Sequence, residues 1–343
     1  MPSRPRTLRI LLLVREGLEP PEDPAALSPE ARAEVRTEID VLGSLRRLGH
    51  EVRVIGLLHE LRPLREAVQE FKPHLAFNLL EEFQETVMLD YSVVTYLRVL
   101  GVAYTGCNSR GMILGRDKAL AKKILAYHRI RIPRFLPVRR GQRMPRAERF
   151  EALGYPLIVK SLMDDGSLGI AEASVVNSHD KLVERVEFFH RSMETSAIVE
   201  EYVPGRELYV TVMGHARLTV LPPWELYMDD LRADAPRIAT RKLKFDTAYQ
   251  EQHGVKIVHA KLPSDVDAEL RRLSKRIYKA LNLSGYARVD YRLHPDGRVY
   301  FLEANPNPDV ALNSESVGAA DSHGWSYDDF VARIVQLGLR SLG

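Results

Sequence analysis

The chain has 343 residues, which is enough for two or three domains with substantial cores. Its 45% hydrophobic and 28% charged residues are typical of a soluble globular protein. The 49 basic and 46 acidic residues nearly cancel, so the composition does not indicate a nucleic-acid partner. Cys107 is the only cysteine, which excludes an intrachain disulfide and a cysteine-cluster metal site and suits a reducing cytosol. We therefore expect a cytoplasmic protein.

The chain begins with a pattern that mimics a signal peptide, because arginines precede the apolar run Ile10–Val14. The run is short and Arg15 follows it at once, so a buried first strand is the better interpretation. No other segment approaches transmembrane length, and we expect no membrane association.

The first domain is expected to alternate strands and helices around a parallel sheet. Strand Leu8–Val14 is followed by a helix that opens at Ser28 and runs to about Leu48, and then by strand Glu51–Leu57. The expected later elements are strand His74–Leu80, helix Tyr91–Leu100 and strand Val102–Gly106.

The rest of the sequence predicts a mixture of helices and strands, and no element is predicted for residues 222–254. The expected helices are Ser109–Tyr127, Asp180–Phe189, Ala268–Leu281 and one from Ser326 to about Leu337. The expected strands are Phe135–Val138, Leu157–Lys160, Ala173–Val176, Ala197–Val203 and Glu207–Met213. We expect domains at 1–107, 108–199 and 200–343.

A hairpin near the C-terminus carries the strongest chemical signal. A Pro-Asp-Gly turn at Pro295–Gly297 joins two short strands. Glu303 and Asn305 are two residues apart and share one face, and pairing can bring Asp290 onto it. Two carboxylates and one amide oxygen suit a Mg²⁺ ion carried by a nucleotide phosphate. Arg288 shares the face of Asp290, so a fixed cation lies beside the expected metal.

Two further segments favour a nucleotide. Lys160 ends an apolar strand, and the glycine-rich loop that follows allows its backbone N–H groups to approach a phosphate closely. The candidate loop residues are Gly166, Ser167 and Gly169. The segment Glu200–Glu207 runs from an apolar strand into acids and then Pro-Gly, which offers backbone groups to an adenine edge. Read alone, each is also compatible with an ordinary loop.

Taken in this order, the motifs resemble the ATP-grasp superfamily, and more closely the D-alanine–D-alanine ligases. The matching segments are Tyr104–Gly106 with Asp117-Lys118, Gly154–Lys160 with Gly166–Gly169, Glu200–Glu207, Arg288–Asp290 and Leu302–Asn305. The resemblance implies an α/β ATP-grasp fold, in which an N-terminal parallel-sheet domain precedes two α+β subdomains that clamp the nucleotide.

The resemblance also assigns roles to single residues. Lys118 and Lys160 would hold phosphates together with the glycine-rich loop. The adenine would meet Glu200 and the backbone of Glu201, Tyr202 and Val203, and Glu207 would bind the ribose. Asp290, Glu303 and Asn305 would hold Mg²⁺, with Mn²⁺ as an alternative. The catalytic residues would be Arg288, Ser167 and Lys244, with Lys242 as an alternative to Lys244.

The sequence departs from the family where the amino acids would bind. Gly166 stands where the family often has a serine, and Asp309 stands where it has a glycine after the metal asparagine. The acids Glu81, Glu82 and Glu85 follow the third strand. At the carboxyl end of a parallel strand they predict a substrate with a positive charge. Asp309 and Glu315 favour the same substrate.

Three functions remain open on the sequence alone. The first is an ATP-dependent ligase that joins a small carboxylate and an amine through an acyl phosphate, and we expect both substrates to be amino acids. The second is a true D-alanine–D-alanine ligase with a divergent substrate pocket. The third is a nucleotide-binding protein without ligase activity, although such a protein has little physical reason to keep these buried charges. Family members are commonly dimers, so a homodimer is possible.

Overall fold

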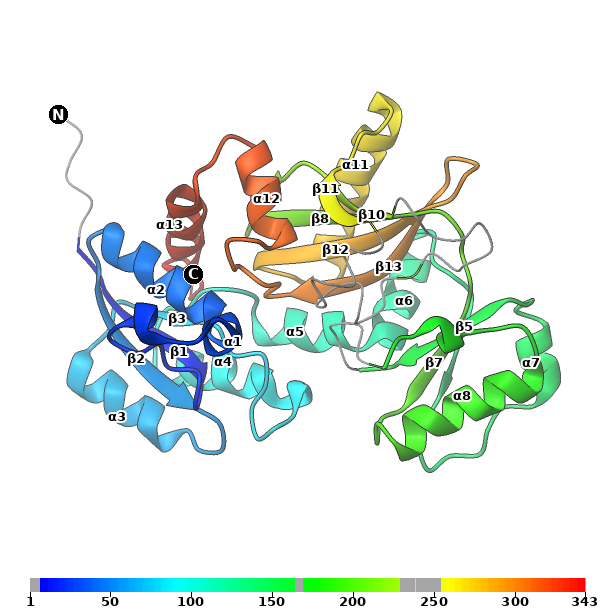
Figure 1. The fold of residues 1–343 in the computed structure, drawn as a ribbon, viewed down its shortest axis with the longest axis horizontal. Helices are drawn as coiled ribbons and strands as arrows, with labels where there is room; N and C mark the ends of the chain where they lie inside the picture. The colour runs from blue at the N-terminus through cyan, green and yellow to red at the C-terminus, as the bar shows by residue number, and fades with distance from the viewer. Residues whose placement is uncertain (1–6, 164–168, 229–237, 239–253, 343) are drawn as a thin grey trace.

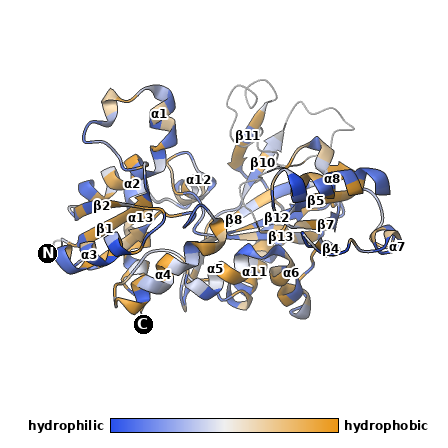
Figure 2. Ribbon diagram, turned by 90° about the horizontal axis from the view of Figure 1, so that it is seen from below, coloured by the Kyte–Doolittle hydropathy of each residue, from blue (hydrophilic) through white to orange (hydrophobic). Residues whose placement is uncertain are grey.

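The computed structural model describes residues 7–163, 169–228, 238 and 254–342. Figure 1 shows three sheets side by side, with the N-terminal sheet at one end, the C-terminal sheet in the middle and a smaller sheet at the other end. The expected mixed α/β architecture is therefore present. Figure 2 shows hydrophobic and hydrophilic residues on different faces of the helices that cover the sheets.

The N-terminal sheet is parallel, in the order β2-β1-β3. Its strands are β1 Arg9–Arg15, β2 Glu51–Leu57 and β3 Leu75–Asn78. Every residue of 10–14 is fully buried, because helices cover both faces of the sheet. Ile10, Leu12 and Val14 pack in one core cluster, and Leu11 and Leu13 pack in another on the opposite face.

The elements of this unit differ from the sequence prediction in three ways. Its helices are α1 Pro29–Glu34, α2 Arg36–Arg47, α3 Arg62–Phe71 and α4 Asp90–Val99. The helix expected from Ser28 to about Leu48 is broken at Val35, which has non-helical backbone angles. Helix α3 was not predicted, since it buries only Leu64 and Ala67 fully. The strand expected at 102–106 is reduced to an isolated parallel bridge between residues 76 and 104.

The smaller sheet is antiparallel, in the order β4-β7-β5-β6. Its strands are β4 Phe135–Val138, β5 Leu157–Ser161, β6 Val175–Val176 and β7 Ala197–Glu201, and its helices are α7 Ala147–Glu151 and α8 His179–Arg191. Helices α5 Ser109–Arg116 and α6 Lys118–Tyr127 precede it. One continuous helix was expected there, but Asp117 caps α6 by accepting a hydrogen bond from the Leu120 N–H group.

The C-terminal sheet runs β11-β10-β8-β12-β13, and β9 pairs with β8. Its strands are β8 Arg206–Gly214, β9 Leu218–Val220, β10 Trp224–Met228, β11 Val255–His259, β12 Gly285–Leu293 and β13 Val299–Pro306, and its helices are α11 Ser264–Ala280 and α12 Glu315–Ser322. Strands β9, β10 and β11 and helix α12 were not predicted. Alternate residues of β8 and β12, such as Val210 and Val289, join a core cluster that also contains residues of α11.

The last helix, α13 Tyr327–Gly338, returns to the N-terminal sheet. It packs with β1 and α2 in one cluster, and Asp328 accepts hydrogen bonds from Ser44 and Arg47 of α2. The last helix therefore packs against the N-terminal unit of the chain. The three domain boundaries expected from sequence stay a prediction. Within the described ranges no helix is both long enough and apolar enough to cross a membrane.

Two glycines make a close backbone contact between the first unit and the C-terminal sheet. Gly285 has φ +65°, and a Cβ atom added to it would lie 2.1 Å from the carbonyl oxygen of Gly106. Gly106 itself has φ +91°. Both the left-handed backbone and the close approach require glycine at this junction.

We predict that Gly285→Ala destabilises the protein more than Gly49→Ala does. Gly49 has φ +80° but nothing lies within 4 Å of the added Cβ, so its substitution isolates the backbone cost of about 1 kcal/mol. The collision at Gly285 adds about 1–3 kcal/mol. Thermal denaturation of both variants measures the difference, and equal melting temperatures would contradict the close contact.

Candidate active site

One face of the C-terminal sheet carries the expected metal ligands and the arginine expected beside them. Strand pairing sets Asp290 opposite Glu303, and Arg288 opposite Asn305. Directly opposed residues of antiparallel strands share a face, so all four side chains lie together. On the other side of β12, Asp290 pairs with Tyr209 and Arg292 with Glu207.

Arg288 holds Asp290 with two parallel hydrogen bonds. Its Nε lies 2.7 Å from Asp290 Oδ1, and its Nη2 lies 2.9 Å from Oδ2. Asn305 Nδ2 donates to the same Oδ2 at 3.0 Å, and Arg288 also reaches Glu315 on α12 at 3.4 Å. Burial alone would lower the pKa of Arg288, but Asp290 and Glu315 raise it well above its ordinary value. The guanidinium is therefore a permanent charge beside the expected metal position.

Lys118 faces the same hairpin from the start of α6. Its Nζ lies 3.5 Å from Glu303 Oε2, and its side chain is only 5% exposed. A lone lysine on a helix would ordinarily be solvated. Here the fold places the Lys118 ammonium beside Glu303, an expected metal ligand.

A buried triad of charges lies beneath these residues. Glu200 is 1% exposed, and its carboxylate lies 3.1 Å from Lys122 Nζ and 3.2 Å from Lys160 Nζ. Burial would raise the pKa of Glu200, yet the two lysines hold it below its ordinary value. Lys122 was missed in the sequence. Its spacing of four residues from Lys118 puts both on one helix face, and that spacing is the signal that would have identified it.

The triad bears on the role expected for Glu200. Both lysines contact its carboxylate, and Lys122 also donates to the Leu302 carbonyl at 2.6 Å. Removal of one partner from such a buried group costs about 3–5 kcal/mol. Glu200 therefore positions Lys160. This role is additional to the adenine contact expected for Glu200 from the resemblance.

The expected adenine segment follows β7. The N–H groups of Glu201 and Tyr202 donate to the carbonyls of Arg134 and Pro156. The Glu201 side chain pairs with Arg134 at 2.8 Å. The N–H groups of Glu201 and Tyr202, two of the three expected backbone donors to adenine, therefore already donate to carbonyls within the protein. The third expected donor is the N–H group of Val203.

Glu207, the expected ribose ligand, lines a pocket between β8 and β10. Arg292 Nη2 lies 2.8 Å from its Oε2, and Tyr209 Oη donates to its Oε1 at 3.0 Å. Arg292 also lines the pocket and was not identified from the sequence. A ribose hydroxyl would have to share Glu207 with these two groups.

Part of the phosphate loop falls outside the described residues, namely Gly166 and Ser167, and so do Lys242 and Lys244. Gly169 is described: it has φ +70°, and an added Cβ would lie 2.9 Å from the Phe189 ring. Arg185 of α8 donates to the Gly169 carbonyl. This end of the loop is therefore fixed against α8.

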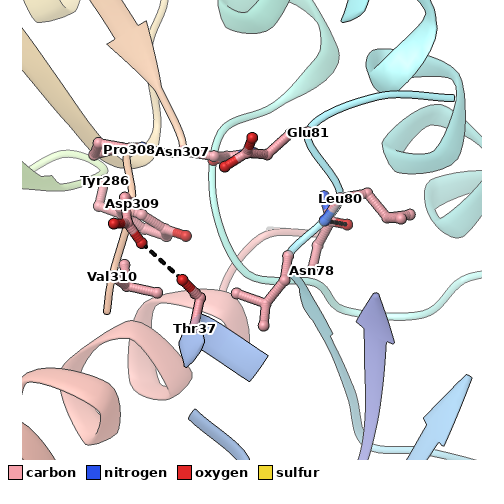
Figure 3. Close-up of a pocket in the computed structure, with 10 residues that line it drawn as sticks. Thr37, Asn78, Leu80, Glu81, Tyr286, Asn307, Pro308, Asp309 and Val310 are labelled. Carbon is pink, nitrogen blue, oxygen red and sulfur yellow. Dashed lines mark hydrogen bonds between the residues drawn. The ribbon is translucent and has the colours of Figure 1, made fainter. Parts of the chain in front are cut away.

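A second group of acids lies around a pocket between α2, the segment after β3 and the segment after β13 (Figure 3). We call it the acidic pocket; its polar lining residues are Thr37, Asn78, Glu81, Tyr286, Asn307 and Asp309. Asp309 Oδ1 accepts from Thr37 at 3.0 Å and from the Ala311 N–H group at 2.9 Å. Glu38, on α2 beside Thr37, is 7% exposed.

The acids expected at this rim are only partly brought together. Glu81 lines the pocket, but Glu82 pairs with Arg15 at 2.5 Å and is not among the lining residues. Glu85 is exposed at a turn with φ +56° and does not line the pocket either. The expectation of three rim acids is therefore wrong for two of them. Glu38, from a different element, was not predicted.

Comparison with known proteins identifies the family. Residues 124–336 match the model described as "D-ala D-ala ligase C-terminus". A D-alanine–D-alanine ligase of Nitratidesulfovibrio vulgaris is 30% identical over 88% of this chain and 91% of that protein. The chain belongs to the D-alanine–D-alanine ligase family. It is accordingly an ATP-dependent, ADP-forming ligase that makes a C–N bond.

Other relatives agree along nearly the whole chain. A D-alanine–D-alanine ligase of Desulforudis audaxviator is 28% identical over 91% of this chain and 95% of that protein. The fold matches the crystal structure of the Bacillus anthracis D-alanine–D-alanine ligase complexed with ATP, with a TM-score of 0.76 over 97% of this chain and 98% of that one at 23% identity. The ATP-grasp fold expected from the sequence is confirmed.

The oxygen ligands of this family member fit a hard divalent cation. Asp290 and Glu303 supply carboxylates and Asn305 an amide on one face, which leaves coordination positions for phosphate oxygens and water. No cluster of three or more His, Cys, Asp or Glu side chains able to hold a metal exists in the described part of the chain. A metal here would therefore depend on phosphate oxygens to complete its shell.

Glu38 makes the stability of this ligase depend on pH. Burial raises its pKa to about 7, with contributions from Glu81 and Asp309. Between pH 4.5 and about 7 the folded protein holds a proton that the unfolded chain releases, so the free energy of unfolding falls as pH rises. Below pH 4.5 both states are protonated and the full stability is present.

We predict that Glu38→Gln removes this loss, because glutamine keeps the shape of the neutral acid. At pH 8 the variant should be more stable than the wild type, by at most about 3 kcal/mol at about 1.4 kcal/mol per pH unit between the two pKa values. At pH 4.5 the two should be equal. Melting temperatures across this range test it, with the exposed Glu66→Gln as control; a constant difference at every pH would contradict it.

Proposed function

We propose that the enzyme activates a small carboxylate with Mg-ATP and joins it to an amine, with amino acids as substrates, in the cytoplasm. The observation that carries this proposal is the shared face of Arg288, Asp290, Glu303 and Asn305, with Lys118 facing it. The acids suit a metal nucleotide and the bases suit phosphate oxygens. A homodimer stays a prediction.

Asp290, Glu303 and Asn305 would hold Mg²⁺, which when bound neutralises phosphate charge and orients the γ-phosphate for transfer. Lys118 now contacts Glu303, and Arg288 contacts Asp290. With a metal on these acids, the two bases would be available to phosphate oxygens.

The remaining nucleotide contacts are assigned from the resemblance to the family. Lys160, oriented by Glu200, points its charge to the phosphates. Val203 offers its N–H to the adenine edge, and Glu207 accepts from the ribose. For Ser167, Gly166 and Lys244 the expected phosphate and catalytic roles remain predictions from the resemblance alone.

The chemistry has two steps. A substrate carboxylate oxygen attacks the γ-phosphorus of ATP, which forms an acyl phosphate and releases ADP. The amine then attacks the acyl carbon, the C–O bond to phosphate breaks, and an amide, inorganic phosphate and a proton are released. Arg288 is placed to stabilise the negative charge of the acyl phosphate and of the tetrahedral intermediate.

The runner-up is D-alanine–D-alanine ligation with a divergent pocket. It is favoured by the names of relatives that match about nine-tenths of the chain. The divergent residue in the acidic pocket is Asp309, which stands where the family has a glycine.

We predict that Asp290→Asn and Glu303→Gln each abolish metal-dependent ATP turnover while the protein stays folded. Each substitution removes a charged ligand without a change in side-chain size. ADP release and circular dichroism are the measurements. The matched control is Asp296→Asn in the exposed turn of the same hairpin, which should keep full activity; full activity in both site variants would sink the metal assignment.

A further inference from the structure

A buried lysine on α6 connects the two sheets that carry the expected nucleotide ligands. The side chain of Lys122 is fully buried, and its Nζ lies 3.1 Å from Glu200 on β7 of the smaller sheet. The same Nζ donates to the Leu302 carbonyl on β13 of the C-terminal sheet at 2.6 Å, and it lies 5.3 Å from the centre of the Phe301 ring. The ammonium of Lys122 is therefore held by both sheets and is closed to solvent.

Lys122 and Lys160 share one carboxylate but differ in their access to solvent. Lys122 lies against Glu200 Oε1, and the Nζ of Lys160 on β5 lies 3.2 Å from Glu200 Oε2. The side chain of Lys160 is 13% exposed, whereas that of Lys122 is 0% exposed. Of these two lysines, only Lys160 has a surface that a ligand can reach.

The charges of this triad explain why one carboxylate has two lysines. Burial would raise the pKa of Glu200, but Lys122 and, to a smaller extent, Lys160 hold it below its ordinary value. Burial lowers the pKa of Lys122, an effect that Glu200 opposes and the charge of Lys160 reinforces. If Lys160 alone compensated Glu200, its move to a phosphate would leave a charged carboxylate buried without a partner, which is strongly unfavourable. With Lys122 in place, the carboxylate keeps a partner when Lys160 leaves.

We propose that Lys122 is a positioning residue that acts through Glu200: it compensates the buried carboxylate and so frees Lys160 to bind a nucleotide phosphate. This inference rests on the proposed function, which takes Lys160 as a phosphate ligand. Lys122 itself is kept from the nucleotide by its burial. Lys118, four residues earlier on the same helix, faces Glu303 instead, so the two lysines serve different acids.

The test compares ATP with adenosine, because only ATP has phosphates for Lys160 to bind. Calorimetric titration gives the dissociation constants of adenosine and of a non-hydrolysable ATP analogue with Mg²⁺. We expect Lys122→Met, which removes the charge and keeps a long side chain, to weaken binding of the analogue about tenfold or more, because Lys160 stays on Glu200. Binding of adenosine should change less than about threefold. Lys123→Met is the matched control on the exposed side of α6 and should change neither constant.

A double variant shows whether the effect passes through Glu200. Lys122→Met combined with Glu200→Gln removes both buried charges and leaves Lys160 an uncharged acceptor, so Lys160 is again free to bind phosphate. The ratio of the two dissociation constants should return to within about threefold of the wild-type ratio. The double variant has no unpaired charge in the triad's interior, so it decides the question even if Lys122→Met alone does not fold. Melting temperatures verify that each variant is folded.

Three results would overturn the inference. An equal loss for the analogue and for adenosine would mean that Lys122 only supports the fold of the site. Unchanged binding of the analogue by Lys122→Met would mean that Glu200 does not require a second lysine. A loss in the double variant as large as about tenfold would mean that Lys122 does not act through Glu200.

The wild-type protein separates this inference from the proposed function. Wild-type protein that binds the analogue no more tightly than adenosine would contradict the phosphate contacts of the proposed function, and the inference with them. Wild-type protein that binds the analogue more tightly, together with a Lys122→Met variant that does the same, would contradict the inference alone.

Discussion

Side chains of a strand alternate between two faces, and this constraint organises the C-terminal sheet. The register of β12 with β13 and β8 is fixed because Val289 and Val210 must reach the core under the sheet. The same register puts Arg288, Asp290 and Glu303 on the opposite face. A slip of one residue would bury the charges and expose the apolar residues, so core packing and site geometry specify each other.

Charges gathered in the partly buried candidate site must be compensated. In this structure they compensate one another: the acids Glu200, Glu207, Asp290, Glu303 and Glu315 pair with the bases Lys118, Lys122, Lys160, Arg288 and Arg292. Under the proposed function, a metal would bind some of these acids, and the bases beside them would be available to phosphate oxygens.

Local patterns predicted the parts of the fold that have strong periodicity or unusual chemistry. The strands β2 and β4 and the metal hairpin were predicted because apolar runs, turn residues and paired acids occur within a few positions. Helix α3 and strands β9, β10 and β11 were missed, because their apolar residues are few or the strands short, and tertiary packing decides their structure. Val35 and Asp117 break helices that looked continuous, since a cap or a local bend depends on backbone angles.

The same limit applies to the site. Residues within one motif, such as Asp290 and Glu303, were identified directly. Arg292 and Glu38 acquire their roles only when distant elements meet, and no pattern in their own segments distinguishes them from solvated charges. Lys122 could have been found from its four-residue spacing to Lys118, although its contacts with Glu200 and Leu302 depend on the fold. Glu82 shows the converse, because a distant arginine neutralises an acid that looked like part of a cluster.

The central claim is that the charged face of the C-terminal sheet binds a metal nucleotide. A crystal structure of the protein with Mg²⁺ and a non-hydrolysable ATP analogue tests it most directly. The account predicts a metal about 2.0–2.1 Å from oxygens of Asp290, Glu303 and Asn305. It also predicts that Arg288 and Lys118 turn from these acids to phosphate oxygens. A nucleotide bound elsewhere, or bound there with Arg288 still clamped on Asp290 and no metal on the three ligands, would contradict it.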